Sequence, residues 1–170
     1  MRNPKFTLTI LASAALTVLA GCANYKLGTT LPPHLKSVYV ETFKNSTKEP
    51  QLETKITSEI IREFQRDGQL KVKDADEADI ILTGVITQYK LDPQRSKRDS
   101  PKATLEYKAI VTVTLVAAER KTGKRIVSQG VTASKIFVVR GDLMTARRNI
   151  LPEVARELGR KVVDAVISAW

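Results

Sequence analysis

Hydrophobic and polar residues alternate most regularly between Leu105 and Ala117. The apolar side chains of this run share one face: Leu105, Tyr107, Ala109, Val111, Val113, Leu115 and Ala117. The polar side chains of the opposite face are Glu106, Lys108, Thr112 and Thr114. This long alternation predicts an antiparallel strand with one covered face and one face open to water or to a partner. The turn that contains Gly123 then predicts a hairpin with a second strand over Ile126–Val139.

Earlier segments also have clear patterns. Their β-branched and aromatic residues predict a first strand over residues 37–43, which the polar run Lys44–Thr47 ends. Apolar residues at helical spacing predict an amphipathic helix that ends at Gly68: Leu52, Ile56, Ile60, Ile61 and Phe64. Gln69–Val72 is a candidate for a short strand, and the composition of Ile80–Leu91 predicts a strand with substantial burial on both faces.

The last segment predicts a helix for which Asp142 is the expected N-cap. We expect Pro152 to kink this helix or to start its main section. The residues predicted to share its buried face are Leu151, Val154, Leu158, Val162, Val166 and Ala169. The element order is strand, helix, three strands, helix. It predicts one α+β domain over residues 37–170, a two-layer sandwich with two helices on one face of a mainly antiparallel four-stranded sheet.

The first 21 residues have the layout of a signal peptide, with a positive start, an apolar run and no acidic residue. The apolar run of about 14 residues is too short to span a bilayer. Leu19-Ala20-Gly21-Cys22 resembles the bacterial lipobox, which implies acyl groups on Cys22. No cofactor is expected besides these acyl groups. Residues 22–36 then form a lipidated flexible tether. Ala23 implies sorting to the outer membrane, where the protein would be anchored on the periplasmic side.

Composition removes several classes of function. Lys and Arg number 28 against 18 Asp and Glu, and the formal charge of +10 favours anionic partners. Export and an aromatic content of 5% exclude nucleic acid as that partner. A single Cys and a single His leave no disulfide and no zinc site. His34 has no nucleophile motif beside it, and the acidic run 74–79 lacks metal-loop spacing, so we predict no enzyme.

Four blocks of the sequence, in this order, resemble the lipopolysaccharide-assembly lipoprotein family LptE. They are VYVETFKNST at Val38–Thr47, EPQLE at Glu49–Glu53, FQRDGQL at Phe64–Leu70 and ADIILTGVI at Ala78–Ile86. The family's fold agrees with the predicted one. The resemblance implies an outer-membrane lipoprotein that plugs an LptD-type β-barrel, helps that barrel assemble and assists insertion of lipopolysaccharide into the outer leaflet.

Basic residues suggest where such a ligand would bind. The predicted loop Asp92–Lys102 contains four cations, and guanidinium groups suit the phosphate oxygens that lipid A carries. Its candidate contacts with lipopolysaccharide or the barrel are Arg95, Lys97, Arg98 and Lys102. A second basic group is expected at the opposite end of the sheet: Arg120, Lys121, Lys124 and Arg125. The alternative for the loop is a solvated segment whose charges keep the hairpin soluble, because exposed ion pairs contribute little individually and the loop would act only as a cluster.

Two further interpretations remain from the sequence. The cations of the last helix are expected on its solvated face: Arg147, Arg148, Arg156, Arg160 and Lys161. The opening strand, Asn-bearing turn and helix also occur in outer-membrane lipoproteins that activate a periplasmic partner such as a peptidoglycan synthase. This is the alternative function.

Overall fold

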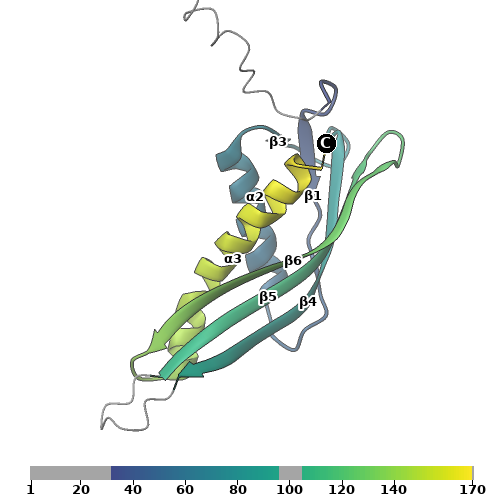
Figure 1. Ribbon diagram of the computed structural model, residues 1–170. Coiled ribbons are helices and arrows are strands. Elements are labelled where there is room, and N and C mark those ends of the chain that lie inside the picture. Colours follow the sequence, from purple (N-terminus) through teal and green to yellow (C-terminus); the bar gives the residue numbers. More distant parts are fainter. Residues whose placement is uncertain (1–31, 96–104, 170) are drawn as a thin grey trace, which may run out of the picture.

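The computed structural model describes residues 32–95 and 105–169. Its strands are β1 (Ser37–Val40), β2 (Lys44–Asn45), β3 (Lys71–Val72), β4 (Ile80–Arg95), β5 (Leu105–Glu119) and β6 (Arg125–Val139). Its helices are α2 (Leu52–Asp67) and α3 (Leu143–Ile167). Both helices lie on the same side of the sheet (Figure 1), so the predicted two-layer α+β architecture is confirmed.

The sheet is mixed and has six strands, in the order β3-β1-β4-β5-β6, with β2 also paired to β4. β1 runs parallel to β3 and β4, whereas β4, β5 and β6 form an antiparallel meander. The prediction of a four-stranded sheet was therefore wrong in strand number. The parallel pairs follow from α2, which acts as a crossover between β1 and the later strands. β2 and β3 have two residues each, too few to show an alternating pattern.

β1 ends at Val40, three residues earlier than predicted, because the chain leaves the sheet to bury Phe43. The backbone N–H of Phe43 donates to Thr57 Oγ1 of α2 at 3.0 Å. The Phe43 ring lies against Gly84 of β4, where an added Cβ would meet the ring at 2.3 Å. A side chain at position 84 would displace this ring, so the packing between β1 and β2 depends on glycine there.

The face of the sheet beneath the helices is called the covered face. β5 contributes Ala109, Val111, Val113, Leu115 and Ala117 to it, all fully buried, as the alternation predicted. Leu35, which the sequence places in the tether, is also buried in this core, at 3% exposure. The opposite side, called the open face, has no helix against it within the described residues.

β4 agrees with its prediction in burial but not in length. Its covered face is buried at Ile80, Leu82 and Ile86, and the residues between them are half-buried, in agreement with the substantial burial predicted for both faces. The strand continues to Arg95, through residues that the sequence predicts to be a loop. β2 pairs with β4 no further than Ile86, so β4 is an edge strand at Pro93, where proline is tolerated.

α3 follows its prediction closely. Asp142 accepts a hydrogen bond from the Thr145 backbone N–H at 2.8 Å, which confirms the N-cap. The predicted apolar stripe from Leu151 to Val166 is buried, but Ala169 is exposed beyond the helix end. The helix continues through Pro152, so this residue neither starts nor ends it.

Candidate functional site

Most of the predicted contact residues cannot be placed. Cys22, Lys97, Arg98 and Lys102 lie outside the described residues, and their roles stay predictions. Arg95 is the last residue of β4, and its backbone is paired with Glu106 of β5.

The sheet has two ends with different contents. The distal end is where β4 stops, β5 starts, β6 stops and α3 begins (Figure 1). The proximal end is where β1 begins and where the turn after Glu119 joins β5 to β6. Because β5 runs the full length between them, Arg95 and the turn 120–124 lie at opposite ends. The predicted separation from the second basic group is therefore confirmed for Arg95, the described member of the first group.

Large exposed hydrophobic side chains gather at the distal end. They are Ile136 at 61%, Met144 at 58%, Val138 at 38% and Leu143 at 36% exposure. Exposed hydrophobic residues that cluster, rather than occur singly, mark surfaces for partners or lipids. Sequence reasoning missed this cluster. The signal was present, because Ile136 and Val138 fall out of phase with Val131 and Ala133, the buried residues of β6.

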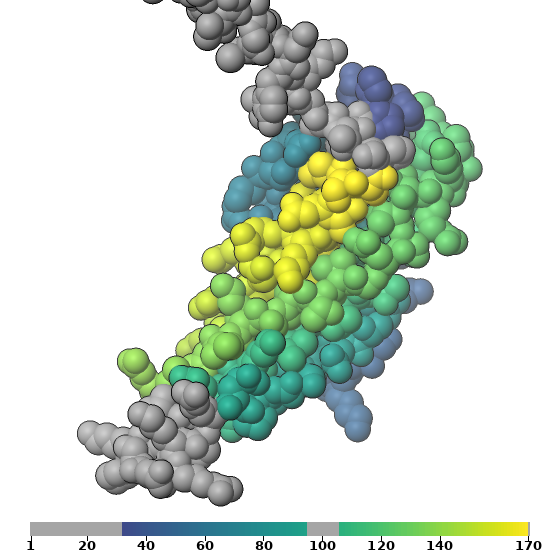
Figure 2. Space-filling view, viewed as in Figure 1, coloured from purple at the N-terminus to yellow at the C-terminus, as the bar shows by residue number. Residues whose placement is uncertain are grey.

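A groove of about 360 Å³ lies between the end of β6 and the start of α3. Figure 2 shows these two elements side by side along the visible face. Phe137, Val138 and Ile150 form apolar parts of the groove lining, and Arg140 and Asn149 contribute polar groups. The Phe137 ring stacks on Tyr107 of β5, with centroids 6.0 Å apart. The carboxylates of Asp142 and Glu153 also line the groove, which therefore combines apolar groups with charges of both signs.

Charges at the distal end are unequally paired. Lys90 Nζ lies 2.9 Å from the Asp92 carboxylate. Hydrogen bonds from Thr145 hold the pKa of the Asp142 carboxyl below its usual range, so this anion serves the helix cap. Arg140 and Arg148 are exposed and form no salt bridge with any described residue. These two guanidinium groups can accept an external anion.

Arg147 is not on the solvated face of α3, and that part of the prediction was wrong. Its guanidinium forms a salt bridge with Glu49 and lies over the Tyr89 ring, 5.3 Å from the centroid. Burial raises the pKa of the Tyr89 phenol, and Tyr89 Oη and Arg147 Nε have no hydrogen-bond partner in the described part of the chain. The other predicted cations of α3 are exposed, as expected: Arg148, Arg156, Arg160 and Lys161.

The open face carries many hydroxyl groups. Thr112 of β5 and Thr132 of β6 face each other there, with their Oγ1 atoms 3.0 Å apart. A second groove of about 280 Å³ crosses this face, and Thr42, Thr83 and Thr114 contribute hydroxyls to its lining. The predicted polar face of β5 is therefore present and unoccupied by other described elements.

Groups considered for catalysis have structural roles at the proximal end. Asp79 accepts hydrogen bonds from the Lys36 backbone N–H at 3.0 Å and from the Ser37 hydroxyl at 2.7 Å. These bonds lower the pKa of the Asp79 carboxyl. His34 Nε2 lies 3.6 Å from Glu119 Oε1, at the surface. No group of three or more potential metal ligands occurs among the described residues.

Neither α2 nor α3 has the length and hydropathy needed to cross a bilayer.

Fold and site together define a two-layer α+β domain with one open sheet face and an amphipathic distal end. This fold recurs in solved structures at low identity. A protein from Xanthomonas campestris of family DUF330 is 9% identical, with 84% of this chain and 91% of that chain covered and a TM-score of 0.59. The Paraburkholderia phytofirmans PelC dodecamer is 17% identical, with 78% and 87% covered and a TM-score of 0.51. A minor lipoprotein from Acinetobacter baumannii is 15% identical, with 79% and 94% covered and a TM-score of 0.52.

The chain belongs to the LptE family, described as lipopolysaccharide-assembly, whose model matches residues 35–166. The resemblance carried by the four sequence blocks is thereby confirmed, and the match extends over both helices and the hairpin. No curated protein matches the chain at the sequence level.

Proposed function

We propose that this protein is an outer-membrane lipoprotein that assists insertion of lipopolysaccharide into the outer leaflet. In this proposal Cys22 carries the acyl anchor on the periplasmic side, and residues 22–36 connect it to the domain. An LptD-type β-barrel is the partner, which the domain plugs and helps to assemble. The observation that carries the proposal is the family match over residues 35–166, combined with an amphipathic distal end.

The distal end has the chemistry that a saccharolipid requires. Ile136 and Met144 offer exposed aliphatic surface to acyl chains. Arg140 and Arg148 offer guanidinium groups to phosphates, which they bind through paired N–H donors. The predicted contact Arg95 ends β4, and Lys97, Arg98 and Lys102 follow it in the chain; all four would add to this positive charge.

The open face is the surface that we assign to the barrel wall. The helices cover the other face, so β4, β5 and β6 present only their open side to a surrounding protein. The hydroxyls of Thr112, Thr114 and Thr132 can exchange hydrogen bonds with polar side chains of a barrel lumen. Glu106 and Lys108 belong to the same face, near the distal end.

Replacement of Arg95, Lys97, Arg98 and Lys102 together by Ser tests the ligand. We expect binding to phosphorylated lipid A to fall by tenfold or more, with the circular dichroism spectrum unchanged. The matched control replaces four exposed cations elsewhere: Lys55, Lys71, Lys135 and Arg156. Unchanged binding by the first variant, or an equal loss by the control, would refute the assignment of this segment.

Purification from detergent-solubilised outer membrane tests the partner. We expect a large β-barrel to co-purify, and depletion of the protein to reduce lipopolysaccharide at the cell surface. Recovery with a peptidoglycan synthase and normal surface lipopolysaccharide would favour the alternative function instead. For the anchor, Cys22→Ser should leave an uncleaved precursor by mass spectrometry.

A further inference from the structure

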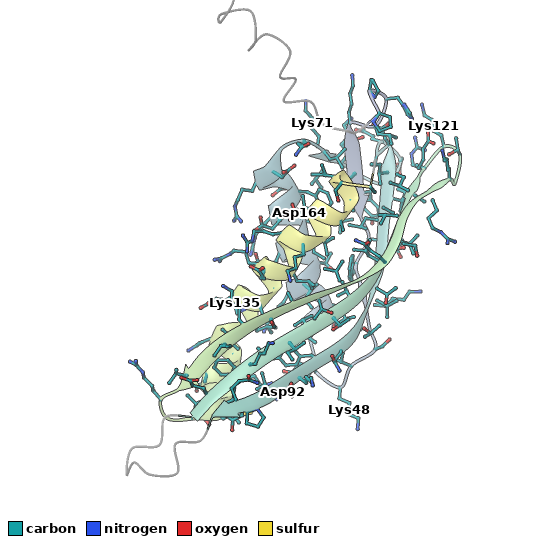
Figure 3. The ribbon with its side chains drawn as sticks, viewed as in Figure 1. Lys48, Lys71, Asp92, Lys121, Lys135 and Asp164 are labelled. Carbon is teal, nitrogen blue, oxygen red and sulfur yellow. The ribbon has the colours of Figure 1, made fainter. Side chains whose placement is uncertain are left out.

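The turn between β5 and β6 is the most cationic described segment that the proposed function leaves unused. We call residues Arg120–Arg125 the basic turn; four of these six residues are Lys or Arg. All six are exposed. Lys121 lies at the same end of the molecule as Lys71 of β3, far from Asp92 at the distal end (Figure 3).

Hydrogen bonds fix the shape of the basic turn. Gly123, which has a φ of 70°, donates its backbone N–H to the Glu119 carbonyl at 2.8 Å. Thr122 Oγ1 donates to the Glu119 carboxylate at 2.7 Å and accepts from the Lys124 backbone N–H at 3.1 Å. Arg120 Nε donates to the Ala78 carbonyl at 2.7 Å, which ties the base of the turn to the domain. The other three cations of the turn have no such bond from their side chains to the described domain: Lys121, Lys124 and Arg125.

Two of the four neighbouring carboxylates, those of Glu77 and Asp79, are occupied by other groups. Glu77 pairs with Lys73 at 3.3 Å. Asp79 accepts from the Lys36 backbone N–H at 3.0 Å and from the Ser37 hydroxyl at 2.7 Å. Asp74 and Asp76 are exposed on the adjacent turn. None of Lys121, Lys124 and Arg125 forms a salt bridge within the described ranges, so their charge is available to an external anion.

The basic turn lies where the tether joins the domain. His34 Nε2 is 3.6 Å from Glu119 Oε1, the residue that precedes the turn. Cys22 is ten residues before Pro32, the first described residue. Ten extended residues reach at most roughly 36 Å, so a membrane that holds Cys22 lies within one tether length of the turn.

We propose that the basic turn binds anionic phospholipid headgroups of the leaflet that holds the acyl anchor. This inference rests on the proposed acylation of Cys22 and is independent of the lipopolysaccharide role. Lysine and arginine near an anionic leaflet strengthen association by roughly fivefold per cation. The turn supplies a second, electrostatic attachment beside the acyl chains. It would hold the proximal end of the domain at the headgroups of that leaflet.

The test uses the acylated protein, which begins at Cys22, in vesicles, with a fluorophore on the single free thiol of a Ser128→Cys variant. Ser128 is exposed and lies three residues after the basic turn, outside its hydrogen bonds. Vesicles contain a headgroup-attached quencher and either 30% phosphatidylglycerol or only phosphatidylcholine. We expect at least fivefold stronger quenching with phosphatidylglycerol. This difference should disappear at 0.5 M NaCl, where the Debye length is only about 4 Å and salt screens the attraction between the turn and the headgroups. The same fluorophore at Met144→Cys, at the distal end, should show no such difference.

Charge removal gives the matched comparison. Quenching with phosphatidylglycerol should fall at least fivefold when Ser replaces Lys121, Lys124 and Arg125 together. It should change less than twofold when Ser replaces three exposed cations elsewhere: Lys55, Lys135 and Arg156. The salt titration of the unsubstituted turn decides the question if the first variant fails to fold.

Equal quenching in both vesicle types, with the protein retained on them, overturns this inference and leaves the proposed function standing. If the protein instead leaves the vesicles and Cys22 reacts with a thiol reagent, acylation is absent, and both proposals lose their anchor.

Discussion

The covered and open faces of the sheet are built from the same strands but differ in what supports them. On the covered face of β5, Val113 and Leu115 are fully buried beneath the helices. On the open face, Thr114 between them is exposed, and Val116 is only half-buried by its neighbours in the sheet. Burial in this fold therefore comes from one side. The effect of a substitution should depend on the face more than on the type of residue.

Two strand glycines give the sharpest test of this difference and the largest expected effect. Gly84→Ala on the covered face would bring Cβ to 2.3 Å from the Phe43 ring, so the ring or β4 must move. Overpacking of this kind costs about 2 kcal/mol. Gly130→Ala on the open face meets only the Val113 carbonyl, at 3.9 Å, and should stabilise slightly by reducing the entropy of the unfolded chain.

Urea denaturation of both variants measures the two free energies of unfolding. The contrast between the faces fails if the alanine at position 84 is tolerated as well as the alanine at position 130. A Phe43→Leu change in the Gly84→Ala background provides the control, because the smaller side chain should recover part of the loss.

The sequence predicts the regular strands and helices of this fold better than the places where the chain departs from a regular element. The alternation from Ala109 to Ala117 identified the covered face because five successive inward positions are apolar. Nothing in the local sequence indicates that Phe43 leaves β1 to lie on Gly84, because that contact joins residues far apart in the chain. The parallel pairing of β1 depends in the same way on where α2 returns the chain.

Arg147 and Arg148 are adjacent in α3 but face different surroundings: Arg147 turns toward the covered face of the sheet and Arg148 toward solvent. Arg147→Ala removes the salt bridge with Glu49 and the contact with the Tyr89 ring. The pair is only partly buried, so we discount the cost of a fully buried pair to about 1–2 kcal/mol. Arg148→Ala, which removes an exposed side chain, should change the free energy of unfolding by less than about 0.5 kcal/mol.

Denaturation of both variants and of Arg147→Lys checks this difference. The lysine keeps the charge but loses the planar group over Tyr89, so we expect an intermediate value. Equal stability of the two alanine variants would show that the Glu49 contact contributes nothing.

The candidate site was predictable only in part, for physical reasons. Arg95 and the basic turn lie at opposite ends of the sheet because β5 separates them, and the loops before and after any long strand are separated in this way. The exposed cluster at the distal end was missed because Ile136 and Val138 were counted as strand residues without regard to phase. Arg147 was assigned to solvent because its partner, Glu49, is distant in the sequence and helical spacing does not reveal it.

The smallest expected effect is at the proximal edge of the sheet, where neither face buries the group. Hydrogen bonds from Lys36 and Ser37 lower the pKa of Asp79 from its ordinary value of 3.8 in the folded state. The ionised carboxylate therefore stabilises the fold above the unfolded pKa, and this contribution is lost as the pH falls through the lower, folded pKa.

Asp79→Asn should therefore cost stability at pH 7 and progressively less as the pH falls below 3.8. Asp79 is partly exposed, and solvent screening limits the difference at pH 7 to less than about 1 kcal/mol. The measurement is the free energy of unfolding of both proteins at pH 7, 5 and 3. Asp76→Asn, at an exposed position with no hydrogen bond given by the described residues, is the control and should leave stability unchanged. A cost for Asp79→Asn that stays constant down to pH 3 would mean that packing, rather than the charge, holds β1 against β4.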